Sequence, residues 1–215
     1  MTFKGFPAEA IEFYEGLEAD NSKAYWTENK SVYEEMVHAP MAALLEELSA
    51  TYGESKIYRP YRDVRFSADK SPYKTAIAAS LVDGGYVQLS AQGLSAGCGM
   101  WMMETDQLER YRRAVDAQAS GSELEGLVTS LRKKDIEVGG HDSLKTAPRG
   151  YAKDHPRVEL LKYKGLITWK QWPLARWLST AAAKGRVGDF FETSRPITNW
   201  LAENVGESTA PARSR

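Results

Sequence analysis

Residues 75–90 read TAIAASLVDGGYVQLS, and this stretch decides the fold class. Core-type and small residues alternate through 77–82, which is the period of a β-strand with one face on a core. The Asp-Gly-Gly sequence at 83–85 favours a tight turn, because glycine adopts positive φ at no steric cost. Residues 86–90 alternate again, and a further glycine-containing turn leads to a third segment, 96–103. The pattern predicts a three-stranded antiparallel meander.

Helical patterns lie on both sides of this meander. The clearest is an apolar stripe over residues 41–52 that ends at Gly53, a residue type that commonly follows a helix. Further helices are predicted to begin near residues 7, 22, 105, 122, 156, 173 and 187, the one at 122 on a capping-box pattern and the last interrupted at Pro196. A short strand is predicted at 166–169. We therefore predict an α+β fold in which N- and C-terminal helices pack on an antiparallel sheet.

The chain of 215 residues is long enough to bury one core without a metal or disulfide staple. We expect a single α+β domain over residues 1–205. The last ten residues, 206–215, read GESTAPARSR, a small and polar sequence that predicts a disordered tail.

Overall composition favours a cytoplasmic protein without a membrane partner. With 28 basic and 29 acidic residues the net charge is -1, which argues against a protein that coats nucleic acid through bulk charge. The single cysteine, Cys98, fits a reducing compartment, and we expect it to be a buried packing residue. Residues 1–10 lack the pattern of a signal peptide, and no stretch approaches 18 apolar residues.

Positive charge is concentrated in two windows. Residues 56–75 contain six basic and two acidic residues, and residues 145–164 contain six and two again. Each window therefore has a local net charge of +4 in a chain whose total is -1. The excess cations require acidic partners from elsewhere, water or a ligand.

We predict that these windows form a pocket for a small anionic molecule, phosphorylated or carboxylated. Arg65 has a planar fork of donors that suits bidentate capture of such a group, and Asp63 would orient that fork. The predicted ligand-binding residues are Arg62, Arg65, Ser67, Asp69, Lys70, Lys74, Tyr151, Asp154 and Lys162. If the pocket is catalytic, His155 and Asp63 are the predicted proton carriers.

Two other interpretations remain open. The same basic face would suit RNA or another nucleic acid, which we favour less. Alternatively the chain is a non-catalytic interaction module, in which Asp63 and Asp69 pair with basic neighbours in a buried architectural network. We predict no metal site, because His141-Asp142 and Asp154-His155 match no ligand signature. The residues assign no cofactor and no oligomeric state.

Residues 61–75, YRDVRFSADKSPYKT, closely resemble a segment of domain-of-unknown-function family 2461. Two further segments agree with the family, 20–30 (DNSKAYWTENK) and 148–162, and the likeness covers nearly the whole chain. It implies a single cytosolic α+β domain and no particular reaction. It also implies that the three segments meet at one end of the sheet.

The chain departs from the family pattern at two places. Tyr25-Trp26 stands where the family usually has Trp-Phe, and Thr146 stands where a basic residue is expected. These departures affect contacts at those positions alone.

Overall fold

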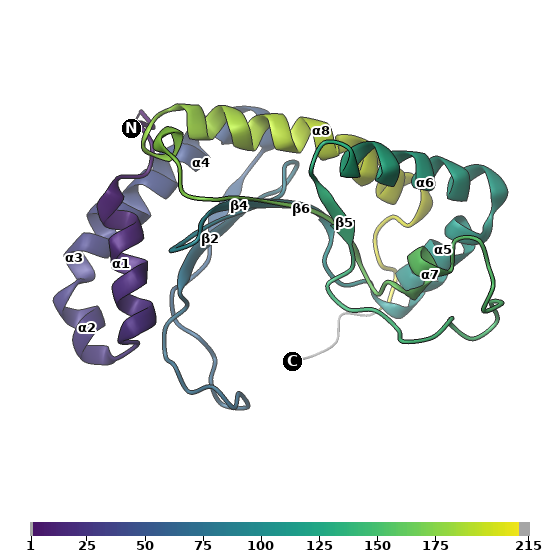
Figure 1. Ribbon diagram of the computed structural model, residues 1–215, viewed down its shortest axis with the longest axis horizontal. Helices are drawn as coiled ribbons and strands as arrows, with labels where there is room; N and C mark the ends of the chain where they lie inside the picture. Colours follow the sequence, from purple (N-terminus) through teal and green to yellow (C-terminus); the bar gives the residue numbers. More distant parts are fainter. Residues whose placement is uncertain (1, 211–215) are drawn as a thin grey trace. The chain divides into compact units, whose positions relative to one another are not determined.

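The computed structural model describes residues 2–210, and its fold is α+β, as predicted (Figure 1). The strands are β1 (Ser55–Ile57), β2 (Ala76–Leu81), β3 (Tyr86–Ser90), β4 (Gly93–Met100), β5 (Glu137–Gly139) and β6 (Leu166–Trp172). They form one antiparallel sheet in the order β1-β2-β3-β4-β6-β5.

The helices precede and follow the meander in the chain. They are α1 (Ala8–Ala19), α2 (Lys23–Glu28), α3 (Lys30–Val32), α4 (Ala39–Tyr52), α5 (Thr105–Asp116), α6 (Gln118–Arg132), α7 (Val158–Lys162) and α8 (Ala182–Asn204). A π-helical turn, η1, spans Tyr33–His38, and a 3-10 helix, η2, spans Arg176–Ser179.

The chain divides into two compact units. The first comprises Met1–Ala96 with Gln171–Phe191, and the second comprises Gly97–Lys170 with Glu192–Arg215. Strands β4 and β6 and helix α8 contribute residues to both. A single domain over residues 1–205 stays a prediction, and each unit is described below by itself.

The meander at the centre of the first unit agrees with the period-two pattern. Strands β2 and β3 pair antiparallel, with Ala76 opposite Ser90 and Ala79 opposite Val87. The third strand, β4, begins at Gly93, three residues earlier than predicted. Gly93 has a φ of +115°, and a Cβ there would lie 2.3 Å from the carbonyl oxygen of Trp172, so only glycine lets the strands approach.

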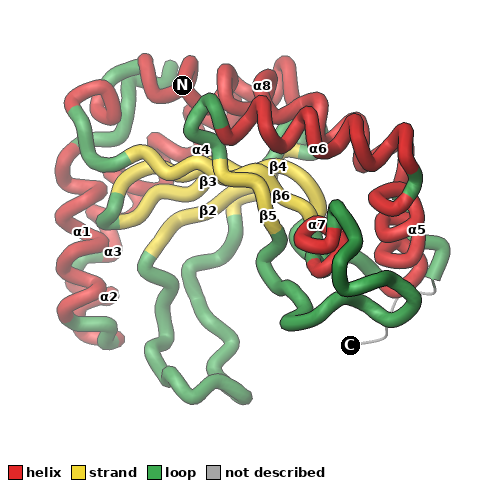
Figure 2. Tube along the Cα trace, turned by 45° about the vertical axis from the view of Figure 1, so that its right-hand side comes forward, coloured by secondary structure: helices red, strands yellow, loops and turns green. Residues whose placement is uncertain are grey.

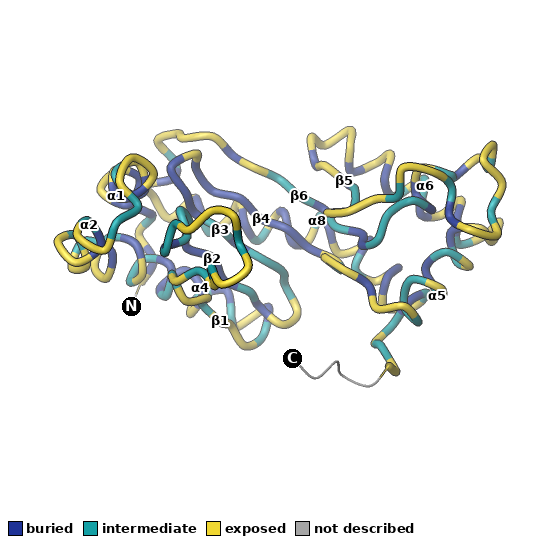
Figure 3. The backbone as a smooth tube through the Cα atoms, turned by 90° about the horizontal axis from the view of Figure 1, so that it is seen from below, coloured by how far each residue is buried: buried dark blue, intermediate teal, exposed yellow. Residues whose placement is uncertain are grey.

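Helix α4 packs against β1 and β2, and its predicted apolar stripe is buried (Figure 2). Helix α1 buries an aromatic face that includes Phe13 and Tyr14, and it exposes its glutamates (Figure 3). Ile77, Ala79 and Leu81 are buried and alternate along β2, so they share one face of the sheet, and α4 contacts this strand. Strand geometry places Ala76 on the opposite face of β2.

Three predicted helix boundaries were wrong. Helix α6 begins at Gln118, and Ser122 lies inside it, while the capping box belongs to α5, where Glu104 and Gln107 bond reciprocally. Helix α8 continues through Pro196, because its residues on both sides of the proline are buried and packing offsets the lost backbone bond.

The third error concerns the helix that was predicted to begin at residue 173. Only the short 3-10 helix η2 forms there. The backbone N–H of Phe6 donates to the carbonyl of Leu178 at 2.8 Å. This long-range bond occupies an acceptor that a continuing helix would use.

Arg157 organises the helices of the second unit from a buried position. Its Nε donates to the carbonyl of Val115 at 2.6 Å, and its Nη2 donates to the carbonyl of Asp116 at 2.9 Å. These are the last two carbonyls of α5, which the helix cannot satisfy itself. Nη1 lies 3.4 Å from Glu125 of α6. A Cβ on Gly121 would lie 2.5 Å from Nε, so α6 approaches the guanidinium closely.

The start of the predicted tail is bonded to α5 in the same unit. Arg110 donates to the carbonyl of Val205, and Gln107 donates to that of Gly206 at 2.8 Å. Ser208 donates to Asp106 at 2.7 Å. The remainder of the predicted tail, 211–215, lies outside the described residues. No helix within residues 2–210 is long and apolar enough to cross a membrane.

Replacing Arg157 should destabilise the protein. Arg157→Met leaves the buried carbonyl of Val115, the partly buried carbonyl of Asp116 and the carboxylate of Glu125 without their donor, so we expect a loss of about 2–4 kcal/mol in the free energy of unfolding. Urea denaturation measures it. Lys153→Met, at an exposed position of the same basic window, is the matched control and should leave the midpoint within error. Equal midpoints for the two variants would contradict the capping role.

Candidate functional site

A long hairpin, residues 58–75, joins β1 to β2 and projects beyond the sheet (Figures 1 and 2). It extends the antiparallel pairing of these strands. Tyr58 donates its N–H to Ala78 at 2.8 Å, and Lys74 donates to Pro60 at 2.8 Å. Arg62 donates to Pro72 at 2.9 Å. Both prolines act only as acceptors here, so their missing N–H groups cost the ladder nothing.

Helix α2 and the residue before its cap hold this hairpin in place. The side-chain amide of Asn21 donates to the carbonyl of Tyr73 at 3.1 Å and accepts from its N–H at 3.0 Å. The rings of Trp26 and Tyr73 stack with centroids 4.4 Å apart and planes 7° from parallel. Ser22 caps α2 by accepting from the N–H of Tyr25 at 3.1 Å. Two of the three segments that resemble the family therefore meet in the first unit.

Ion pairs order the tip of the hairpin. Arg65 binds Asp63 in a fork, with Nε 2.9 Å from one carboxylate oxygen and Nη2 2.7 Å from the other. Arg62 pairs with Asp69, which also accepts from the N–H of Ser71 at 2.9 Å. The interaction-module hypothesis predicts such pairs as a buried network, but these pairs are largely exposed.

The arginines lower the pKa of both carboxyls. Hydrogen bonds from the side chain and then the N–H of Arg65 lower the pKa of Asp63 from 3.8 to about 2. Hydrogen bonds from Arg62 and Ser71 hold the pKa of Asp69 well below its usual range. Both carboxylates are therefore charged and engaged at neutral pH.

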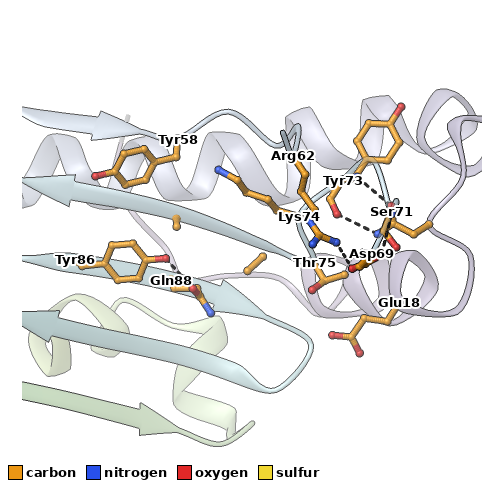
Figure 4. Close-up of a pocket in the computed structure, with 13 residues that line it drawn as sticks. Glu18, Tyr58, Arg62, Asp69, Ser71, Tyr73, Lys74, Thr75, Tyr86 and Gln88 are labelled. Carbon is orange, nitrogen blue, oxygen red and sulfur yellow. Dashed lines mark hydrogen bonds and ion pairs between the residues drawn. The ribbon is translucent and has the colours of Figure 1, made fainter. Parts of the chain in front are cut away.

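A groove runs from this hairpin onto the face of β2 and β3 that α4 leaves free (Figure 4). Its cavity volume is about 730 Å³. The small side chains of Ala76 and Ala78 in β2 line it together with the rings of three tyrosines. The lining residues are Glu18, Asn21, Tyr58, Arg62, Asp69, Ser71, Tyr73, Lys74, Thr75, Ala76, Ala78, Tyr86 and Gln88.

Charges of both signs line the groove. Lys74 lies over the ring of Tyr58, with Nζ 5.9 Å from the ring centre, and it has no ion pair with any acid in residues 2–210. Arg62 is paired with Asp69. Glu18 accepts from the side-chain amide of Gln92 at 3.1 and 3.3 Å. One cation and one carboxylate thus face the groove without an opposite charge.

The structure distributes the predicted site residues over three places. Arg62, Asp69 and Lys74 line the groove. Asp63, Arg65, Ser67 and Lys70 lie at the hairpin tip, outside its lining. Tyr151, Asp154, His155 and Lys162 belong to the second unit. That all of them serve one ligand stays a prediction.

Sequence reasoning missed several residues of the groove. Asn21 lies in a segment quoted for the family resemblance, which was the one signal for its role. Glu18 comes from α1, Tyr58 from the start of the hairpin, and Tyr86 and Gln88 from β3. Only folding brings these segments together, so the spacing of these residues in the sequence carried no signal.

Hydrogen bonds in the second unit occupy both ring nitrogens of His155. Its Nε2 lies 3.1 Å from a carboxylate oxygen of Asp116, and its Nδ1 accepts from the N–H of Arg157 at 3.0 Å. An accepting Nδ1 assigns the proton to Nε2, which donates to Asp116. This arrangement fixes the residue that precedes α7, and proton transfer by His155 would first break one of these bonds. Lys162 is paired with Glu159 at 2.6 Å.

The other residues that the sequence analysis considered, Cys98, His141 and Asp142, are buried or in contact with other side chains. Cys98 is buried, and desolvation raises the pKa of its thiol to about 12. His141 stacks on Trp101 with ring centroids 3.9 Å apart, while Asp142 pairs with Lys164 at 2.5 Å. Across residues 2–210, no three or more His, Cys, Asp or Glu side chains gather as a metal site.

The fold and the groove define an α+β protein whose antiparallel sheet carries a polar groove beside a long ion-paired hairpin. The chain belongs to the family described as conserved hypothetical protein (DUF2461), whose model matches residues 9–200. This match confirms the resemblance in the three quoted segments. Neither the curated proteins nor the solved structures include a match to the chain.

Removing the two hydrogen bonds between Asn21 and Tyr73 should make the hairpin less ordered. Asn21→Ala deletes both bonds to Tyr73, each worth roughly 1 kcal/mol, so we expect the Tyr73 amide to exchange with solvent about tenfold faster or more. Hydrogen exchange followed by NMR measures this. Lys23→Ala, an exposed change in the same segment, should leave the exchange rate alone. Unchanged protection in Asn21→Ala would show that the stacked rings alone hold the hairpin.

The ion pair at the tip should be visible in an acid titration. We expect the carbon-13 shift of the Asp63 carboxyl to titrate with a midpoint near 2, and with a higher midpoint in Arg65→Ala, which removes the guanidinium but keeps the N–H of residue 65. Because the folded pKa lies below the ordinary value, the pair stabilises the tip above about pH 4, and this contribution is lost as pH falls towards 2. A wild-type midpoint near 3.8 would show that the fork does not persist in solution.

Proposed function

We propose that the groove binds a small molecule with a phosphate or carboxylate group, which Lys74 and Arg62 contact at the hairpin end. The observation that supports this most directly is Lys74. Its ammonium group lines the groove, and none of the acids with described positions neutralises it. A cation held in this way favours an anionic partner, because charge-assisted hydrogen bonds are the stronger ones.

The shape of the groove suits a ligand larger than a lone anion. Its volume of about 730 Å³ lies within the range of small-molecule sites. Ala76 and Ala78 leave room above the sheet, and the rings of Tyr58 and Tyr86 stand 6.4 Å apart beside them. The tyrosine rings and the alanine side chains offer apolar contact to the body of a ligand, while the hairpin end offers charge.

Glu18 sets a further requirement on the ligand. Its carboxylate would repel a second anionic group, and it accepts hydrogen bonds from hydroxyl or amino groups. A molecule with one anionic end and several hydroxyl groups, such as a sugar phosphate, satisfies both ends of the groove. The charges of Arg62 and Asp69 already offset each other. This pair therefore contributes to the choice between ligands more than to the overall attraction of anions to the groove.

A calorimetric titration tests the proposal. Wild-type protein is titrated with inorganic phosphate, glucose 6-phosphate, citrate and adenosine monophosphate. We expect at least one organic anion to bind, and Lys74→Gln to weaken it about tenfold, as the loss of one hydrogen bond to a charged group does.

Lys56→Gln is the matched control, because Lys56 is an exposed lysine of the same basic window outside the groove. It should bind as the wild type does. The proposal is overturned if no compound binds, or if the two lysine variants lose affinity equally.

A further inference from the structure

Phe66, at the tip of the 58–75 hairpin, has 96% of its surface exposed. The next most exposed large hydrophobic side chain within residues 2–210 is Val82, at 77%. Leaving a phenylalanine in water forgoes the stabilisation that burial of its ring would supply. A ring presented in this way is a candidate contact for a partner.

Hydrogen bonds and ion pairs order the backbone on both sides of Phe66. The guanidinium of Arg65 donates two hydrogen bonds to the carboxylate of Asp63, and Lys70 donates to the carbonyl of Val64 at 3.0 Å. The pair of Arg62 with Asp69 ties the two arms of the hairpin below the tip. Binding to a preformed tip loses less conformational entropy than ordering a free loop, so the exposed ring is suited to recognition.

Cations lie beside this ring at the hairpin tip. The guanidinium carbon of Arg65 lies 5.9 Å from the centre of the Phe66 ring. The hairpin contains five basic and two acidic residues, and both acids are already paired. Lys70, at the tip, is exposed and has no ion pair with an acid in residues 2–210. An exposed aromatic ring among cations is the combination that binds single-stranded nucleic acid, through base stacking and phosphate contacts.

We propose that Phe66 stacks on an unpaired base of single-stranded nucleic acid, with Arg65 and Lys70 facing the adjacent phosphates. Apart from the shared hairpin, the proposal does not depend on a ligand in the groove, because none of these three residues lines it. Arg65 keeps donors beyond the two that bind Asp63, so it can contact a phosphate without breaking its pair.

Insertion of the tip into a lipid surface fits the same residues less well. Burying Phe66 among lipid headgroups would also desolvate Asp63 and Arg65, which lie within three residues of it. Stacking requires only the face of the ring and leaves these charges in water. We therefore favour the nucleic acid and use vesicles as the competing arm of the test.

The test uses the full chain and a ten-nucleotide uridine oligomer with one 2-aminopurine, whose fluorescence is quenched when it stacks. We expect binding with quenching in the wild type. Phe66→Ala should weaken binding about tenfold or more and abolish the quenching, and Phe66→Trp should retain both, since one base stack is worth about 1–3 kcal/mol.

Val82→Ala is the matched control, as an exposed apolar residue in another turn. It should bind as the wild type does, and equal melting temperatures would show that Phe66→Ala is folded. The proposal is overturned if the oligomer does not bind, or if Phe66→Ala binds with the same affinity and quenching. It is also overturned if Phe66-dependent binding appears only with vesicles of phosphatidylcholine and phosphatidylserine.

Discussion

The side-chain amide of Asn21 bonds both backbone groups of Tyr73, and the hairpin 58–75 depends on this clamp. The amide supplies the donor and acceptor that a neighbouring strand would otherwise supply at that residue. Trp26 adds a stacked ring on the same residue, so two kinds of interaction fix one point of the hairpin. Since the groove and the exposed tip are both built from this hairpin, their geometry depends on Asn21, the residue before a helix cap and more than fifty residues away in the chain.

A surplus of cations in a window of sequence is a poor measure of the charge that a ligand meets. Arg62 and Arg65 belong to the first surplus, but both are paired with acids of the same hairpin. Arg157 belongs to the second, yet it is buried and serves the end of α5. Arg157 binds backbone carbonyls, and because these carry no formal charge, a count of charged residues does not include them. The accessible charge is therefore concentrated on fewer residues, Lys74 among them.

The hairpin presents different chemistry on its side and at its tip. Beside the sheet it contributes Lys74 and Arg62 to a groove that alanines and tyrosines also line, which supports the proposed binding of a small anion. At the tip it presents Phe66 among cations, which supports stacking on a base. The same ion pairs brace both regions, because the two arms of the hairpin are tied together at Arg62 and Asp69. A change there would therefore affect both surfaces.

The period-two pattern of residues 75–90 and the apolar stripe of residues 41–52 were enough to predict the meander and α4, because both patterns depend on neighbours along the chain. The path of α8 through Pro196 and the role of Arg157 depended on burial and on distant carbonyls, which no local pattern encodes. By itself, the sequence determined the fold class and the segments that carry charge. Which charges stay accessible was decided by the tertiary structure. The pairing of Arg62 with Asp69 and the bond of Arg157 to the Val115 carbonyl form only when the chain has folded.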